Sequence, residues 1–402
     1  MKHIFQVFFL PLIIIVFMAV PRIFGTPWHA IAGPNSVREF DGLPFQYESY
    51  LLVRTSNILQ NNVLSDRNTN LNSDEYRALI PIYLMNTLIS LEISPSISLH
   101  ITDIVFWWFG SIGTYGLARH FRSPHRAAVI SSMLTASSPL GVAFIGGFGL
   151  HTAQSMSLSI YIFLILRILH GSHNILCSSV LIAVLLFSSQ YVYNYYLYII
   201  PLLLLYLIIY RSAKNLRVII YSTFLYIILY IVSLILVTNT FTYQPHFNSP
   251  WRLLVDRVVI FRIFDFSYFV MLFNNCLVIV LNFVADFHPL ICLFGLVGFL
   301  ASSTHLQITV LIGVFIMFCE ALIYGVPWVT MSVYPFIYVL AGLGVSFTHS
   351  NVIYYLKYRY KYFISSILYI FLPILMIIVT NIDLFGDSSF AVRWWQWWYI
   401  PR

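Results

Sequence analysis

The sequence predicts an all-α integral membrane protein, with about eleven transmembrane helices in a single domain over residues 1–402. Hydrophobic residues make up 60% of the chain and charged residues only 9%, and the mean hydropathy is +0.84. Apolar stretches of about 20 residues, long enough to span a bilayer as helices, recur from end to end. These runs are continuous and lack the alternation with a period of two that strands show, so we expect helices throughout.

Eleven apolar stretches are the candidate spans, and the amino terminus is expected on the inner side of the membrane. The spans are 4–24, 98–118, 127–145, 151–168, 175–193, 195–210, 218–238, 287–303, 306–325, 331–347 and 362–380. With this assignment the inner loops carry eleven basic residues and no acidic residue. All fourteen acidic residues fall on the outer side, as the positive-inside rule allows. The net charge of +7 therefore reflects orientation in a membrane and does not indicate nucleic-acid binding.

Two further apolar stretches, 78–94 and 269–284, are expected to lie flat on the outer surface as interfacial helices. Counting either one alone as a span would reverse the orientation of the chain after it and move the later basic clusters outside. Internal Asn86 and Glu92 in the first stretch, and three asparagines in the second, suit an interface better than the lipid interior.

Three segments are expected on the outer face: the first loop, 25–97, a second large loop, 239–286, and the tail, 381–402. The part 25–77 of the first loop holds six of the fourteen acidic residues, namely Glu39, Asp41, Glu48, Asp66, Asp74 and Glu75. The tail contains the run RWWQWW at 393–398, which is typical of an aromatic anchor at a membrane interface. A transporter would place its ionisable groups inside the helix bundle instead, so the acidic loop favours chemistry at the outer surface.

Asp41 is the candidate catalytic residue of the first loop. Transfer of a group from a lipid-linked donor needs a carboxylate that takes the proton of an acceptor hydroxyl. Asp41 precedes a run, 45–61, in which apolar and aromatic residues recur at helical spacing, so a simple helix-capping role is the alternative. Asp103, near the outer end of the span 98–118, is expected either to cap its helix or to face the cavity.

The candidate substrate-binding residues are mostly arginines, which match the oxygens of a phosphate leaving group. Arg252, Arg257 and Arg262 of the second outer loop are the main candidates, and their alternative role is to anchor the loop at the interface by pairing with acidic residues or lipid head groups. Further candidates for substrate contacts are Glu48, Arg54 and His151. The outer histidines lack metal-ligand spacing, so the sequence predicts no metal site.

Several short motifs resemble GT-C glycosyltransferases, including the protein mannosyltransferase-like and aminoarabinose-transferase-like enzymes. The run DGLPFQYE at 41–48, directly after the first span, is similar to the start of that family's first extracytoplasmic loop. GLARHF, RSPHRAA and VISSMLTASSPL then follow in the family's order of second span, basic inner turn and third span. VPWVTMSVYPFIYVLAGLG at 326–344 is similar to a late span with a Tyr-Pro motif.

The resemblance implies a polyprenyl-phosphate sugar as donor and gives Asp41 the role of catalytic base or of the group that orients it. The sugar would pass to a lipid, glycan or protein acceptor by a single inverting displacement. The chain departs from the family at Gly42, where a second acidic residue is common, and in the Gly-rich segment 146–150, which lacks an acidic residue. A divalent metal held between two carboxylates is therefore not supported, and no other cofactor is expected.

Two other functions compete with the transferase hypothesis. An O-antigen-type polysaccharide polymerase has a similar size and aromatic content, but its large outer loops usually lie in the middle of the chain. A flippase or transporter for a lipid-linked saccharide would carry ionisable groups within its spans. In each case the expected location is a multi-pass position in a bacterial or archaeal plasma membrane or in the endoplasmic reticulum, with membrane lipids as partners and the active face outside the cytoplasm.

Overall fold

The structure is a computed structural model, and every regular element in the part of the chain that it describes is a helix. The described residues are 2–23, 79–93, 95–138, 149–171, 174–192, 199, 203–207, 209, 212–240, 270, 287, 289–324, 334–355 and 374. The elements are α1 (Lys2–Ile4), η1 (Phe5–Phe9), α2 (Leu10–Ile23), α6 (Leu79–Ser90), α7 (Pro95–His120), α8 (His125–Ala136), α10 (Gly149–His170), α11 (Ile175–Val192), α13 (Ala213–Thr240), α16 (Pro289–Ala301), α17 (Thr304–Tyr324) and α18 (Tyr334–Tyr355). Each of the long helices overlaps an apolar stretch that the sequence predicts to be helical.

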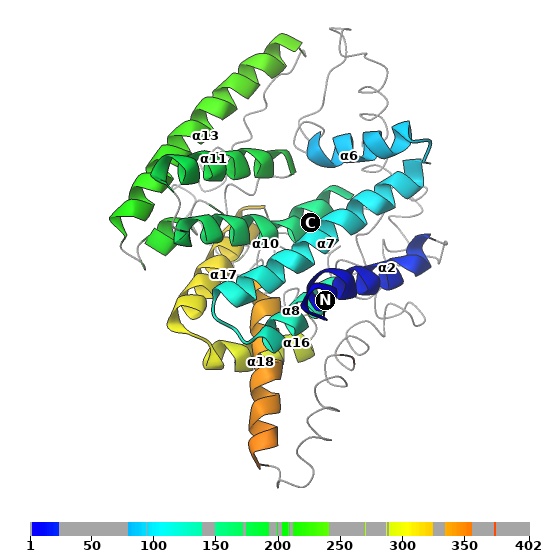
Figure 1. The fold of residues 1–402 in the computed structure, drawn as a ribbon, viewed down its shortest axis with the longest axis vertical. Coiled ribbons are helices and arrows are strands. Elements are labelled where there is room, and N and C mark those ends of the chain that lie inside the picture. Colours follow the sequence, from blue (N-terminus) through cyan, green and yellow to red (C-terminus); the bar gives the residue numbers. More distant parts are fainter. Residues whose placement is uncertain are drawn as a thin grey trace.

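The long helices pack in a row in which each contacts the next. Figure 1 shows α2, α7, α10 and α11 side by side, with α13 packed beyond α11. Helices α8 and α18 also pack against α7, and α18 contacts both α8 and α16. The main core cluster draws buried residues from α7, α8, α10, α11, α13, α17 and α18, so these helices share one apolar core.

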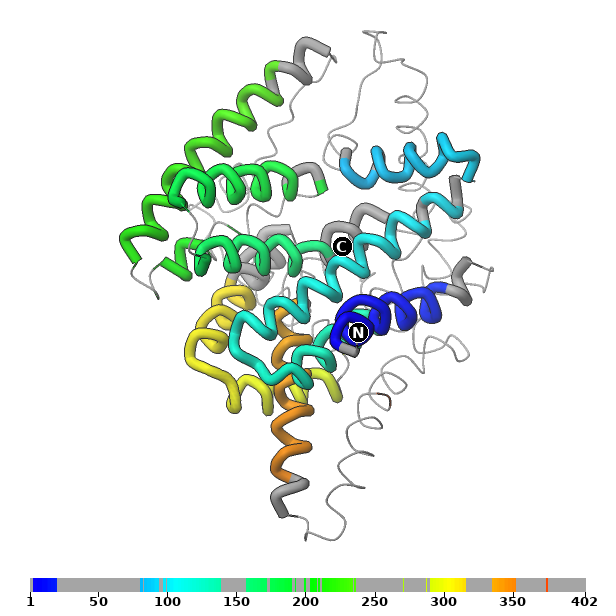
Figure 2. The backbone as a smooth tube through the Cα atoms, in the orientation of Figure 1, coloured from blue at the N-terminus to red at the C-terminus, as the bar shows by residue number. Residues whose placement is uncertain are grey.

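Helices α6 and α7 form a hairpin, which Figure 2 shows as two tubes joined by a short turn. The turn is closed by hydrogen bonds from Glu92 N to Ile89 O (2.9 Å) and from Ile93 N to Leu88 O (3.2 Å). Glu92 adopts a φ of 65° there, as the left-handed residue of such a helix end. Ile80 and Leu84 of α6 pack against the main core cluster. The predicted helix is thus present, but it packs on the bundle, and its position at a membrane surface stays a prediction.

Small residues let α7 and α10 approach closely. Ser159 of α10 donates a hydrogen bond to the carbonyl oxygen of Gly110 at 2.6 Å. A Cβ atom added at Gly113 would lie 2.6 Å from the Cα atom of Ile160, and one added at Gly116 would lie 2.6 Å from the ring of Phe163. Close contacts through glycine and serine are typical of helix packing in membrane proteins, where burial of apolar surface does not itself drive association.

Helix α8 ends earlier than the sequence predicts. The predicted span runs from 127 to 145, whereas the helix stops at Ala136 and Ser137 leaves helical geometry at φ −105° and ψ 17°. Pro139 disfavours helical geometry in the residue before it, and the Ser137 hydroxyl bonds to the carbonyl of Met133 at 3.0 Å. The segment 139–148 lies outside the described residues, so the described part of α8 is too short to span a bilayer.

One helical stretch in the described part of the chain is long and apolar enough to cross a membrane by length and composition, Ala213–Ser233 of α13. Shorter apolar helical stretches occur at Phe5–Ala19, Ser157–His170, Ile175–Ser189, Leu290–Ala301 and Thr304–Phe315. The predicted spans 195–210 and 362–380 and the three outer segments lie wholly or largely outside the described residues. The number of eleven crossings therefore stays a prediction.

Candidate functional site

Most of the residues that the sequence singles out for catalysis lie outside the part of the chain that the structure describes. These are Asp41, Glu48, Arg54, Arg252, Arg257 and Arg262. His151 lies in the first turn of α10, but its side chain is outside the described part as well. Their roles stay predictions, and two other groups of polar residues supply the geometry that can be described.

The first group centres on Asp103, which is fully buried in α7. It lies eight residues, and about 12 Å along the axis, from Pro95 at the start of this helix. Ser98 and Thr102 beside it are also buried, and the Thr102 hydroxyl donates to the carbonyl of Ser98 at 2.8 Å. A cap would lie at the exposed start of the helix. The buried position therefore agrees with the alternative that Asp103 faces the interior.

The helix face that carries Asp103 packs against the end of α8. Trp107, one turn further along, is fully buried and donates from Nε1 to the carbonyl of Thr135 at 2.8 Å. Near the same end of α8, the Tyr338 hydroxyl of α18 donates to the hydroxyl of Ser138 at 2.9 Å. This end of the bundle therefore buries a carboxyl and several hydroxyl groups among the ends of three helices.

The second group lies at the other end of α7, which we call the basic end. The basic end is defined by the contacts that its residues make there, namely those of His3, the turn 121–124, Gly171, Lys214 and His349. His3 Nδ1 lies 3.1 Å from His125 Nε2. Lys214 donates from Nζ to the carbonyl of Gly171 at 3.3 Å, and Arg126 bonds to His349. The sequence assigns each of these segments to the inner side of the membrane. These contacts bring the segments together at one end of the bundle, and the membrane crossings between them stay a prediction.

Acidic residues avoid the basic end in the described part of the chain. Glu92 lies in the turn before α7, Asp103 in the half of α7 nearest that turn, and Glu320 near the far end of α17. The opposite ends of α7 therefore differ in charge, as the sequence predicts from its loops. This separation is the main electrostatic feature of the described residues.

Two histidines at the basic end resist protonation. Burial, with smaller contributions from His170 and Arg167, lowers the pKa of His120 to about 4. The pKa of His125 is also lowered, first by burial and then by the positive charges of His3 and Arg119. His125 donates from Nε2 to Gln6 Oε1 at 3.1 Å, and its Nδ1 is hydrogen-bonded to the Tyr115 hydroxyl at 3.0 Å. Both residues lie beyond the predicted end of the span, at 118, and their imidazoles are neutral at pH 7.

An open cavity of about 540 Å³ lies at the basic end between the amino-terminal helix, α7 and α10. Its polar lining residues are His3, Tyr115, Arg119, His120 and Arg167, and none of the described residues that line it is acidic. Its apolar lining residues are Ile4, Val7, Phe8, Ile112 and Phe163, which lie further along the helices, and Gly116 completes the set. The cavity is therefore cationic near the helix ends and apolar toward the middle of the bundle.

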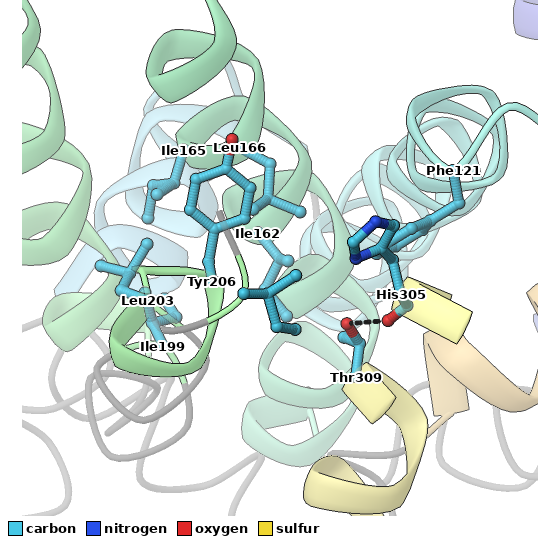
Figure 3. Close-up of a pocket in the computed structure, with 10 residues that line it drawn as sticks. Phe121, Ile162, Ile165, Leu166, Ile199, Leu203, Tyr206, His305 and Thr309 are labelled. Atoms are coloured by element: carbon cyan, nitrogen blue, oxygen red, sulfur yellow. Dashed lines mark hydrogen bonds between the residues drawn. The ribbon is translucent and has the colours of Figure 1, made fainter. Parts of the chain in front are cut away.

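A second cavity, drawn in Figure 3, is too small for a substrate. Phe121, His305 and Thr309 line one side of it, and Ile199, Leu203 and Tyr206 line the other. Its volume of about 20 Å³ fits about one water molecule. The Tyr206 hydroxyl bonds to His170 Nδ1 at 2.8 Å nearby, so this region fastens the segment 203–207 to α10.

Within the described residues, no three histidine, cysteine or acidic side chains gather in a way that could hold a metal ion.

The inner histidines are the residues that reasoning from the sequence missed. Seven of the twelve histidines lie in segments that the charge pattern assigns to the inner side, and none of the seven is among the predicted site residues. Those seven are His3, His120, His125, His170, His173, His305 and His349. Their common side was a usable signal, but their spacing along the chain could not show that His3 meets His125 or that His120 meets His170.

No family model matches this chain, and no curated protein sequence is significantly similar to it.

Proposed function

We propose that this protein is a multi-pass membrane glycosyltransferase of the GT-C type, which moves a sugar from a polyprenyl-phosphate donor to an acceptor on the outer or lumenal side. The buried carboxyl of Asp103 is the observation that supports this proposal most strongly. It lies in the half of α7 away from the basic end, on the side where the chain leaves the acid-rich segment 25–77. Carboxylates from two segments would then serve one outer site.

Exposed apolar surface supports the membrane location. The exposed large apolar residues of α13 include Leu216, Ile220, Phe224, Ile227, Ile231 and Ile235. The amino-terminal helix exposes Ile4, Phe5, Phe8, Phe9, Ile13 and Phe17. Apolar surfaces this extensive are rare on water-soluble monomers and are expected where helices face lipid. About eleven crossings, with the basic end inside, follow from the charge of the loops.

The proposed reaction is a single displacement at the anomeric carbon of the donor sugar. Asp41 accepts the proton of the acceptor hydroxyl as its oxygen attacks, and the bond from that carbon to the phosphate oxygen breaks. The lipid phosphate or diphosphate leaves with the bonding electron pair, and Arg252, Arg257 and Arg262 stabilise its charge. Asp103 is proposed to line the acceptor side of the site, where a buried carboxylate orients a hydroxyl group by accepting its hydrogen bond.

The test is sugar transfer by the purified protein in nanodiscs, with polyprenyl-phosphate sugars as donors and a membrane glycolipid extract as acceptor. Loss of a general base typically costs about 10²–10⁴-fold in rate, so Asp41→Asn should lose nearly all transfer. Glu92→Gln, which removes an exposed carboxylate from the turn before α7, is the matched control and should transfer at the rate of the unmodified protein. A folded protein that transfers no sugar from any donor would exclude the proposal, and full activity in Asp41→Asn would return Asp41 to a capping role.

A saccharide-lipid transporter is a second candidate, because a buried carboxyl such as that of Asp103 would also suit a transport pathway. An ionisable group buried within a spanning helix is costly and commonly marks a transport pathway. The transporter hypothesis predicts that Asp103→Asn stops translocation of a fluorescent lipid-linked saccharide in proteoliposomes and that no glycosidic bond is formed. Transfer in nanodiscs without translocation in proteoliposomes would decide for the transferase.

A further inference from the structure

We infer that the cavity at the basic end is a binding site for the phosphate head group of an anionic phospholipid from the inner leaflet. The inference is separate from the proposed transferase, because the cavity lies at the end of α7 opposite to Asp103. It rests on the cationic charge, the shape and the apolar continuation of the cavity.

The charge of the cavity suits a phosphate group. Arg119 and Arg167 line it from α7 and α10, and arginine is always ionised in proteins. One guanidinium nitrogen of Arg119 donates to the carbonyl of Ser123 at 2.7 Å, which holds the side chain at the helix end and leaves further N–H groups for a ligand. Because no acidic residue stands among the described residues of the lining, a phosphate would balance the two positive charges. Arginine pairs bind phosphate oxygens through paired N–H groups.

Neutral polar side chains complete the polar half of the cavity. His120 and Tyr115 line it beside the arginines, and Tyr115 is held by its hydrogen bond to His125 at 3.0 Å. His3 enters from the amino-terminal helix, and its contact with His125 fixes that helix end next to the start of α8. The arrangement therefore places polar side chains in fixed positions around a concentrated positive charge.

The apolar half of the cavity distinguishes a lipid from a soluble phosphate compound. Ile112 and Phe163 line it two turns or less from the arginines, and Phe8 and Ile4 line it from the facing helix. Ile4 is 57% exposed and Phe8 is 41% exposed, so the cavity opens directly onto an apolar helix surface. A head group between the arginines would place its acyl chains along this surface. Basic pockets between helices on the cytoplasmic side are known to bind acidic head groups in this way.

The experiment is native mass spectrometry of the full-length protein in detergent, with phosphatidic acid, phosphatidylcholine or inorganic phosphate added at equal concentration. We expect phosphatidic acid to be retained and phosphatidylcholine to be lost, with inorganic phosphate bound at least tenfold more weakly than the lipid. Equal retention of the two lipids would overturn the inference. Retention of inorganic phosphate as strong as that of phosphatidic acid would overturn the lipid as occupant, because the apolar half would then contribute nothing.

Substitution of the two arginines that line the cavity tests whether the lipid binds there. Each lipid-facing arginine contributes about fivefold in affinity, so Arg119→Gln with Arg167→Gln should weaken retention of phosphatidic acid by roughly thirtyfold. Arg217→Gln is the matched control, because Arg217 is an exposed arginine near Lys214 that does not line the cavity, and it should retain the lipid fully. An equal loss in the control would show diffuse attraction to basic residues and would overturn the site.

A second variant covers the possibility that the double substitution prevents folding. Arg119→Lys with Arg167→Lys keeps both charges but removes the paired N–H groups, and it should retain phosphatidic acid several-fold less well than the unmodified protein. Phe8→Ser should weaken lipid retention while leaving the binding of inorganic phosphate unchanged. Full lipid retention in both variants would overturn the inference.

Discussion

The imidazole rings of His120 and His170 meet edge to face, with their centroids 4.6 Å apart, and so join the ends of α7 and α10. His170 is in turn bonded to the hydroxyl of Tyr206, which links this pair to the segment after α11. Burial and the neighbouring positive charge make protonation of His120 unfavourable. The contact between the two helix ends therefore depends on a neutral His120.

The first prediction concerns the pH dependence of stability. The pKa of His120 is about 4 in the folded protein and about 6.5 in an unfolded chain, so the unfolded state binds more protons between these values. The contribution of His120 to stability should be fully present above pH 6.5 and fall as the pH is lowered toward 4. The melting temperature in detergent, measured from pH 7.5 to 4.5, should fall more steeply for the unmodified protein than for His120→Gln.

The other charged and titratable groups around His120 are His170 and Arg167 of α10, Arg119 of its own helix and His3 across the cavity. They are present in both proteins, so the difference between the two melting curves isolates the effect of His120. Parallel curves for the two proteins would contradict the assignment of a neutral His120.

The second prediction concerns the crossing of the membrane by α7. This helix has 26 residues and is about 39 Å long, which exceeds the roughly 30 Å of the hydrocarbon core. Glu92 and Arg122 are exposed in the turns at its two ends. In a background with the four cysteines replaced by serine, an impermeant maleimide should label Glu92→Cys in intact cells and Arg122→Cys only after permeabilisation. Labelling of both from outside would show that α7 does not cross, and the reverse pattern would invert the orientation.

The positions of the helices were predictable because apolar length is a local property of the sequence. The described helices α10, α11 and α13 begin and end within about five residues of the predicted spans 151–168, 175–193 and 218–238. The location of His3, His125 and His349 at the same end of the bundle was predictable as well, since it follows from the alternation of charge between successive loops. In both cases the signal lies in a continuous stretch of sequence.

The cavity and the hairpin were not predictable, because both depend on contacts between distant segments. The cavity needs His3 of the amino-terminal helix beside Arg119 and Arg167, and nothing in the spacing of these residues indicates that they meet. Helix α6 packs on the bundle through Ile80 and Leu84. Its internal Asn86 favoured an interfacial position instead, so this packing was not predicted. The end of α8 at Ala136, close to Trp107, was not predicted either, because the apolar stretch continues past it.

The third prediction tests the close crossing of α7 and α10. A methyl group at Gly113 would overlap the backbone of Ile160, which cannot move without shifting α10. Overpacking of this kind typically costs about 1–3 kcal/mol, and a clash with backbone lies at the upper end, so Gly113→Ala should lower the free energy of unfolding by about 3 kcal/mol. Gly295→Ala is the control, because the nearest atom to its new Cβ is Cγ2 of Ile337 at 4.0 Å. SDS titration in mixed micelles should show destabilisation in the first variant alone, and equal stability of both variants would contradict the crossing.

The fourth prediction concerns the turn between α6 and α7, where Glu92 has a φ of 65°. In this left-handed region the Cβ atom of any residue other than glycine lies too close to the backbone carbonyl, at a cost of roughly 1–2 kcal/mol. Alanine keeps that cost and glycine removes it, although glycine also gains freedom in the unfolded chain. Glu92→Gly should therefore exceed Glu92→Ala in free energy of unfolding by about 0.5–1 kcal/mol in the same SDS titration. The exposed Glu92 side chain is lost in both variants, so the comparison isolates the backbone, and a more stable alanine variant would show that the hairpin turn does not adopt this geometry.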